Sequence, residues 1–564
     1  MGPIRAAAGK AGNFNPGKEP VQMNFRSENA PNILFITADQ LRWDFVHAYG
    51  VNPWIHTPNL DSLAEDGCLF ERAYSPNPVC IPARHNILTG LTARYHGFDD
   101  NYFGPDAKPC PSNLPTFAQI LSGCGYSTAA IGKIHFQPER NAAGFDLFEN
   151  CDEVVSDIAE DEYAQFLRSS GHGSLGSIHG VRNALYMQPQ QYPLPQEYHG
   201  SYWIAERAIR YIRSRVTRKR PFLLWAGFIH PHPPLAVPEN WAHLYDGKVP
   251  PHTSPLTPLS KFAEENKCIA DLPDEACVNR VRELYACAVS FMDYNVGRIL
   301  RALDETGQRE NTLVVFVSDH GEMLGDLDTY QKFLPYDASC RVPFLMRWPG
   351  HIQPGSRRKD FVDLNDLLPT FLDAAGASYT AEYPLPGESL LTSQGKKDRS
   401  VQYVEHQREN KRWCCLMDQR YKFVHHYGEP EELFDVEADP EERTNLLYGT
   451  PGDEVRKICD DLRARLLEYE AQWGLPGYVE GGSFRRFPDY EIKTYQECCF
   501  PSAMVQDPGD PPRDSLLDEI LRAIAKEPLV KLSKLHIRDL LTDMGGFSDA
   551  EVDDLLRRAQ DQGN

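Results

Sequence analysis

The sequence lacks an apolar run long enough to cross a lipid bilayer, which takes about 20 consecutive apolar residues. Its first 22 residues are rich in Gly, Pro and Ala and contain no apolar core of the secretory type. We therefore interpret residues 1–30 as a disordered leader and expect a cytoplasmic protein that does not associate with membranes. If a signal peptide had been removed, the protein would instead be periplasmic or secreted.

The chain has fewer basic than acidic residues, 58 Lys and Arg against 80 Asp and Glu, so its formal net charge is −22. This excess of negative charge argues against binding to nucleic acid or to an anionic membrane surface. The 14 cysteines form neither C-x2-C zinc pairs nor a regular disulfide framework. Scattered thiols of this kind favour a reducing compartment. An acidic protein that acts on an anion needs a locally positive pocket, so the cations near candidate functional groups matter more than the total charge.

The length of 564 residues, 41% of them hydrophobic, allows a large core. It predicts either several domains or one large α/β domain with additions. Short apolar runs at residues 32–39, 126–132 and 312–318 have the character of buried parallel strands. Each is followed at once by polar residues. Ligands gather at the carboxyl edge of such sheets, so these polar residues are candidates for a site.

The stretch from Cys80 to Gly90 is the most informative part of the chain. Pro82 suits the first turn of a helix, and Gly90 suits its end. Cys80 would then lie at a helix N-terminus, which favours anions, with Arg84 on the same face. Taken alone, this motif fits an ordinary cysteine and a surface charge at least as well. A phosphatase-type thiolate loop is a poorer match, because such loops have a longer spacing between Cys and Arg.

The complete segment, C-x-P-A-R followed by H-N-I-L-T-G, resembles the signature of the type I sulfatases of the alkaline phosphatase superfamily. The resemblance spans roughly residues 31–469. It implies that a formylglycine-generating enzyme oxidises Cys80 to formylglycine, whose hydrate is the nucleophile. It also implies an α/β fold with a large, mixed, mostly parallel central sheet flanked by helices, a smaller C-terminal α+β subdomain and a helical tail.

The resemblance further implies one divalent metal ion, held by Asp39, Cys80 in its modified form, Asp319 and His320. An acid and an imidazole side by side at a strand end suit such an ion. Many family members carry two acids at this point, whereas this chain has Asp39-Gln40. A neutral amide in place of the second acid resembles the choline sulfatase and phosphonate monoester hydrolase branches. We therefore assign Gln40 to substrate binding. The donor set implies Ca²⁺ or Mn²⁺, with Mg²⁺ as a further candidate.

Further matches to the family supply the remaining candidate residues. Lys133 and His135 belong to a G-K-x-H motif. Residues two positions apart on an extended segment point the same way, so we expect both side chains to face the same anion. His232 lies in a P-H-x-P turn, Lys332 lies twelve residues beyond His320, and Asn101 is a candidate substrate-binding residue.

The resemblance implies a role in the reaction for each of the basic residues near Cys80. Arg84 and Lys133 stabilise the modified residue and the sulfuryl oxygens. His232 or Lys332 protonates the leaving alcohol. His135 takes the last proton of the hydrate, which expels sulfate and restores the aldehyde.

We divide the chain into the leader, a catalytic domain at 31–380, a C-terminal subdomain with an antiparallel sheet at 381–475, and a partly helical extension at 476–564. Residues 150–198 read as an insertion over the active-site face. The extension is expected to serve packing or homo-oligomerisation.

The expected activity is hydrolysis of a small-molecule or oligosaccharide sulfate ester. A phosphonate monoester or phosphodiester hydrolase is the alternative, and the Lys133/His135 pair counts against it. A noncatalytic protein that binds sulfated ligands is the weakest reading, since none of the reactive positions is missing.

Overall fold

The computed structural model describes residues 30–101, 111, 113–136, 142–155, 158–181, 186–267, 272, 274–391, 399–408 and 411–491, with isolated positions at 548, 550, 553–554 and 557. The predicted leader lies outside these residues except for its last position. The helices predicted in the tail also lie outside them, apart from the isolated positions.

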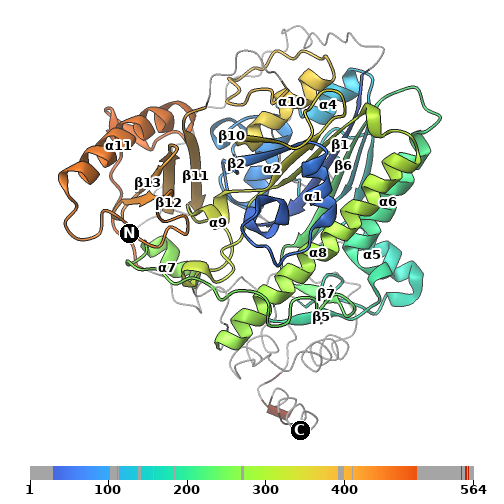
Figure 1. Cartoon of the computed structure of the whole chain (residues 1–564), viewed down its shortest axis with the longest axis horizontal. Helices are drawn as coiled ribbons and strands as arrows, with labels where there is room; N and C mark the ends of the chain where they lie inside the picture. The colour runs from blue at the N-terminus through green and yellow to red at the C-terminus, as the bar shows by residue number, and fades with distance from the viewer. Residues whose placement is uncertain are drawn as a thin grey trace.

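An eight-stranded sheet with the order β10-β2-β9-β8-β1-β6-β3-β4 forms the centre of the molecule (Figure 1). Only β9 runs antiparallel to its neighbours in this sheet, as its pairings with β2 and β8 show. The sheet is therefore mixed and mostly parallel, which confirms the predicted fold class. Its strands are β1 (Asn32–Asp39), β2 (Cys68–Tyr74), β3 (Ser127–Gly132), β4 (Leu147–Asn150), β6 (Phe222–Pro231), β8 (Thr312–Ser318), β9 (Phe344–Arg347) and β10 (Ser356–Asp363).

Helices cover both faces of this sheet because successive residues of a buried strand point to opposite sides. In β1, Leu34 and Ile36 pack with one set of helices, while Ile33 and Phe35 pack with the other. The first set is α1 (Pro58–Glu65), α6 (Gly200–Arg215) and α8 (Glu275–Glu305), and the second is α2 (Cys80–Thr89), α4 (Phe117–Gly123) and α10 (Leu367–Ala374).

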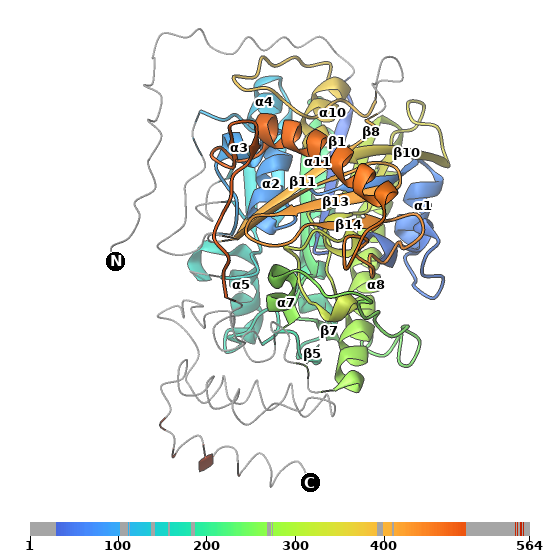
Figure 2. The same ribbon diagram turned by 90° about the vertical axis from the view of Figure 1, so that its left-hand side faces the viewer.

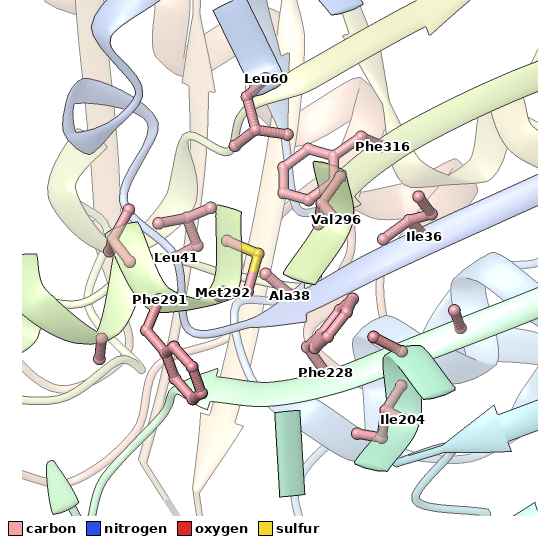
Figure 3. Close-up of a cluster of buried hydrophobic side chains, with 14 of the residues drawn as sticks. Ile36, Ala38, Leu41, Leu60, Ile204, Phe228, Phe291, Met292, Val296 and Phe316 are labelled. Carbon is pink, nitrogen blue, oxygen red and sulfur yellow. The ribbon is translucent and has the colours of Figure 1, made fainter. Parts of the chain in front are cut away.

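The core beneath α8 shows how the first face is held (Figure 3). Met292 and Val296 lie one helical turn apart and meet Phe228 of β6 and Phe316 of β8. Full burial of each such side chain stabilises the fold by about 1.5–3 kcal/mol. The sequence pattern predicts α8 only from Leu284, but the helix begins at Glu275.

A four-stranded antiparallel sheet follows the eight-stranded sheet in sequence and lies beside it, with α11 across one of its faces (Figure 2). Its elements are β11 (Gln402–Arg408), β12 (Lys411–Met417), β13 (Tyr421–His426), β14 (Glu432–Asp435) and α11 (Asp453–Trp473). Several hydrogen bonds fasten it to the core; for example, Trp413 Nε1 donates to the Phe333 carbonyl at 2.8 Å, and Glu405 N donates to the Pro76 carbonyl at 3.0 Å.

The smaller elements are α3 (Ala93–His96), α5 (Glu162–Leu167), α7 (Lys261–Lys267), α9 (Asp337–Cys340), β5 (Gln190–Tyr192), β7 (Ala236–Pro238), β15 (Val479–Glu480) and β16 (Ser483–Phe484). Among the described helices, none combines the length and the apolar character needed to cross a membrane. Each of the ten cysteines that the structure describes is a buried free thiol.

Candidate active site

Cys80 is the first residue of α2, and its position is set by the ends of that helix. Gly90 ends α2 in the left-handed conformation, with φ 67°, and its N–H donates to the Asn86 carbonyl at 2.8 Å. At the other end, Asn101 Oδ1 accepts a hydrogen bond of 2.9 Å from Ile81 N. Asn101 thus accepts a hydrogen bond from one of the N–H groups that have no partner within the helix, and it stabilises the helix end that carries Cys80.

Cys80, Asp39, Asp319 and His320 converge at the carboxyl edge of the sheet. All four are buried, and one potential ligand atom from each lies within 4.8 Å of the others. Cys80 Sγ is 3.2 Å from His320 Nε2 and 3.9 Å from Asp39 Oδ1. They meet because β1 and β8 are adjacent parallel strands: Asp39 ends one, and Asp319 directly follows the other.

This donor set fits a divalent metal ion. His320 Nδ1 lies 3.0 Å from the Gly321 carbonyl, which only accepts, so Nδ1 carries the proton and the lone pair of Nε2 faces the cluster. His320 Nε2 is 3.7 Å from Oδ1 of both Asp39 and Asp319. Two carboxylate oxygens and one imidazole nitrogen suit Ca²⁺, Mn²⁺ or Mg²⁺, and an oxygen on a modified Cys80 would complete the set.

Arg84 binds the far side of the same two carboxylates. Its Nε is 3.0 Å from Asp319 Oδ2, and its Nη2 is 3.0 Å from Asp39 Oδ2. A third bond, from Nη1 to the Lys133 carbonyl at 2.8 Å, fixes the guanidinium plane. Arg84 therefore takes one oxygen of each carboxylate and leaves the other, Oδ1, facing Cys80 and His320.

Lys133 brings a second cation to Asp39. Its Nζ lies 2.5 Å from Asp39 Oδ2 and 2.5 Å from Glu153 Oε2. Burial alone would raise the pKa of Asp39, but Lys133, His232 and Arg84 outweigh it and hold that pKa well below its usual range. Asp39 is thus an ionised carboxylate, as metal binding requires.

The unmodified Cys80 thiol is a poor nucleophile. Burial, reinforced by the nearby Asp39 carboxylate, raises its pKa to about 12. The raised pKa of Cys80 argues against the phosphatase-type thiolate considered from the sequence, since such a thiolate needs a lowered pKa.

The backbone conformation at His135 differs from the extended segment that the sequence predicts. Strand β3 ends at Gly132, and His135 adopts a left-handed backbone with φ 55°, so the alternation of an extended segment does not apply to the Lys133/His135 pair. Lys133 N still donates to the Gly227 carbonyl at 2.9 Å, which keeps Lys133 at the sheet edge. His135 is buried, and burial together with Lys133 holds its pKa well below the usual value.

Lys332, Gln40 and His232 form a chain beside this cluster. Lys332 Nζ is 2.6 Å from Gln40 Oε1 and 3.1 Å from His232 Nε2. Gln40 Nε2 donates to Glu322, so the carboxamide is used at both ends. In this arrangement the Gln40 side chain positions Lys332, and Gln40 N donates to Asp319 Oδ1 at 3.1 Å.

Three residues with contacts in the site had no role in the sequence prediction: Glu153, Tyr186 and Glu322. Glu322 accepts backbone N–H groups of Leu324 and Gln331 at 2.9 and 2.5 Å, besides Gln40. Its place directly after Asp319-His320-Gly321 was an available signal. Glu153 and Tyr186 belong to the insertion, where no periodicity or spacing marks them.

Comparison with known proteins assigns the chain to a family. Residues 31–377 match the family described as Sulfatase. The chain belongs to the sulfatase family. An arylsulfatase of Clostridium perfringens is 32% identical over 489 residues, which cover 82% of this chain and 98% of the relative. A choline-sulfatase of Rhizobium meliloti is 29% identical over 486 residues, covering 82% and 91%. The protein is therefore a sulfuric ester hydrolase, as the signature around Cys80 predicts.

Solved structures show the same sulfatase fold. A phosphonate monoester hydrolase of Agrobacterium radiobacter has a TM-score of 0.68 at 24% identity and covers 81% of this sulfatase and 100% of that chain. A structure in complex with D-glucosamine-2-N,6-O-disulfate has a TM-score of 0.61 at 22% identity, covering 79% and 98%. Residues 325–472 also match the family described as N-sulphoglucosamine sulphohydrolase, C-terminal.

Proposed function

We propose that this sulfatase hydrolyses sulfate monoesters through a formylglycine made from Cys80, with one divalent metal ion held by Asp39, Asp319 and His320. The observation that carries the proposal is the convergence of these three ligands on Cys80, each with one donor atom left facing it. A formylglycine-generating enzyme is the implied partner during maturation.

A divalent ion bound at this cluster would supply positive charge that ionises the nucleophile and polarises the sulfuryl group. The chain's own cations then act on the charge that develops during attack. Arg84 and Lys133 are buried and already fixed by Asp39, so they stabilise the anionic oxygens without reorganising.

Proton transfers fall to the imidazoles and Lys332. His232 and Lys332 lie 3.1 Å apart and are the candidates for protonating the departing alcohol. His135, buried near Lys133, is assigned the final proton from the second hydroxyl of the formylglycine hydrate. Loss of that proton breaks the bond to sulfate by elimination and leaves an aldehyde, which an ester of serine or cysteine could not do.

The substrate class is a sulfated sugar or a smaller alkyl or aryl sulfate. Named relatives support both: an N-acetylglucosamine-6-O-sulfatase of Bacteroides thetaiotaomicron is 26% identical over 533 residues, covering 81% of this chain and 89% of the relative. The arylsulfatase and choline-sulfatase relatives act, by name, on smaller esters. Rates on 4-nitrophenyl sulfate, choline sulfate and sulfated monosaccharides would separate these classes.

A phosphonate monoester or phosphodiester hydrolase is the second candidate. The Asp39-Gln40 and Asp319-His320 pairs permit it, and the similarity to the phosphonate monoester hydrolase structure supports the shared fold alone. Relative rates on an aryl sulfate, a phosphodiester and a phosphonate monoester test both. Faster turnover of the sulfate supports the first proposal, and faster turnover of the phosphonate overturns it.

We also propose a cytoplasmic location, supported by the free thiols of the ten described cysteines. Fractionation of the producing cells tests it, with activity in the soluble cytoplasmic fraction as the expected result.

A further inference from the structure

The segment between β4 and α6 places a carboxylate directly beside two candidate catalytic residues, Lys133 and His232. Glu153 Oε2 lies 2.5 Å from Lys133 Nζ and 3.0 Å from His232 Nε2. Tyr186, from the same segment, has its Oη 3.4 Å from His232 Nε2. Neither residue has a role in the reaction as proposed above.

Glu153 is held in place by its own backbone. Its N–H donates to Asp152 Oδ1 at 2.7 Å, and Asp152 N donates to Asp161 Oδ2 at 2.9 Å. Asp161 also accepts from Ala164 N at 2.7 Å, which ties this turn to the start of α5. A turn after β4, fixed by these hydrogen bonds, therefore positions the Glu153 carboxylate.

The tautomer of His232 decides what this carboxylate does. His232 Nδ1 is 2.6 Å from the Pro233 carbonyl, and a carbonyl oxygen only accepts, so Nδ1 carries a proton. Nε2 is then the nitrogen that gains and loses a proton. Its two charged neighbours act in opposite directions: Glu153 accepts from a protonated Nε2, whereas Lys332 Nζ, 3.1 Å away, donates to a bare one.

We propose that Glu153 is a positioning residue that favours a proton on His232 Nε2 and orients it, so that His232 rather than Lys332 protonates the leaving alcohol. This inference rests on the proposed sulfatase mechanism. As the sulfur–oxygen bond breaks, its electron pair stays on the alcohol oxygen, and the Nε2 proton moves to that oxygen. The neutral imidazole then accepts from Lys332, and water restores the Nε2 proton before the next turnover.

The charges that face His232 set the direction of the pH effect. Burial lowers its pKa to about 4, Glu153 and Asp39 oppose that fall, and Lys332 and Lys133 add to it. Removing the charge of Glu153 therefore lowers the pKa of His232 further. The protonated donor would then persist only at lower pH, and the basic limb of the pH–rate profile would move down.

The test compares esters whose leaving groups need protonation with one whose leaving group does not. Glu153→Gln would be made in the full-length, formylglycine-bearing protein and assayed on an alkyl sulfate and on 4-nitrophenyl sulfate. We expect kcat on the alkyl sulfate to fall about 100-fold, the low end for loss of general acid catalysis. On 4-nitrophenyl sulfate, whose phenolate leaves unaided, the fall should stay within about threefold. Glu153→Asp should recover part of the alkyl sulfate rate.

Glu197→Gln is the matched control, because Glu197 is an exposed carboxylate of the same segment. Equal losses on both esters, or an unshifted basic limb, would contradict the inference. A lower KM with unchanged kcat on both esters would also contradict it and would show that Glu153 obstructs the sulfate site instead. If the unsubstituted protein hydrolyses neither ester, the proposed sulfatase function fails first, and the inference fails with it.

Discussion

Two buried ionic clusters of this molecule are built from similar residues and differ in the backbone that carries them. The active-site cluster consists of Asp39, Cys80, Arg84, Asp319 and His320. The Arg412 cluster, in the C-terminal sheet, consists of Tyr403, Glu405, Arg412, Tyr427 and Glu470. Both lie almost wholly out of contact with solvent. Burial of charge is therefore common to a catalytic centre and to a structural one.

In the Arg412 cluster, one guanidinium group bridges two buried carboxylates. Arg412 Nη2 lies 2.5 Å from Glu405 Oε2 and 2.7 Å from Glu470 Oε1, and its Nε lies 3.1 Å from Glu470 Oε1. The hydroxyls of Tyr403 and Tyr427 both donate to Glu470. These side chains come from β11, β12, α11 and the residue directly after β13, so regular structure holds nearly all of them.

The active-site cluster turns Oδ1 of Asp39 and of Asp319 toward Cys80 and His320, and it sits on irregular backbone. Arg84 satisfies only the outer oxygens of Asp39 and Asp319. Around it, non-glycine residues adopt positive φ: Gln40 at 64°, His135 at 55° and Gln331 at 68°. Such conformations cost roughly 1–3 kcal/mol each and persist where the surroundings impose them. Ligand atoms that converge on one point and strained backbone, more than charge burial, distinguish the functional cluster.

The largest expected effect sharpens this contrast at the nucleophile. Cys80→Ala should reduce sulfatase kcat at least about 10⁴-fold, because no other described side chain occupies the point where the ligands converge. Circular dichroism should show an unchanged fold. Cys124→Ala, at the end of α4, is the control and should keep full activity. Comparable loss in both variants would contradict a special role for Cys80.

The next effect concerns the carboxylates that face Cys80. Asp319→Asn removes a ligand charge and an Arg84 contact, so bound divalent metal and kcat should both fall, the latter at least about 100-fold. Elemental analysis of the purified protein measures the metal. Asp373→Asn, an exposed position on α10, should keep a full complement. Full metal content in Asp319→Asn would remove this residue from the ligand set.

The Arg412 cluster should respond in stability alone. Arg412→Met leaves two buried carboxylates without their cation, which costs about 3–5 kcal/mol in comparable cases. Urea unfolding should show that loss, while kcat per folded molecule stays unchanged. A fall in kcat without a fall in stability would mean that this cluster also serves the reaction.

The smallest effect is a pH dependence in the same C-terminal sheet. His426 Nε2 lies 2.7 Å from Glu432 Oε2. Burial opposes protonation of His426, but the bond to Glu432 outweighs it and raises the pKa of His426 above 6.5. The stabilisation is therefore complete below about pH 6.5 and is lost as pH rises through the folded-state value. Urea unfolding between pH 5 and 9 should show this loss in the parent protein and not in His426→Gln. Parallel curves would contradict it.

Much of the fold and part of the site could be predicted from the sequence. Apolar runs ending in Asp39 and before Asp319 predict strands of a parallel sheet, and such strands bring their carboxyl ends to one edge. That the two strands are neighbours is seen in the structure alone. Gly90 and Pro82 predict α2 with Cys80 at its start. These are local signals with a known period or cap.

Other features depend on chain paths that no local pattern encodes. Glu153 contacts His232 because its turn is fixed by a hydrogen bond to Asp161. The composition of that segment contains no pattern that predicts this contact. His135 leaves the extended conformation just beyond β3, so its side-chain direction could not follow from alternation. Sequence reasoning thus finds groups at strand ends more readily than groups brought in by loops.

The measurement that tests the account most directly is peptide mass spectrometry across Cys80 after co-expression with a formylglycine-generating enzyme. Conversion of cysteine to formylglycine lowers the peptide mass by about 18 Da. We predict that this peptide appears and that its fraction rises in proportion to the sulfatase activity of each preparation. Turnover of sulfate esters by protein in which Cys80 remains entirely a thiol would contradict the proposed nucleophile.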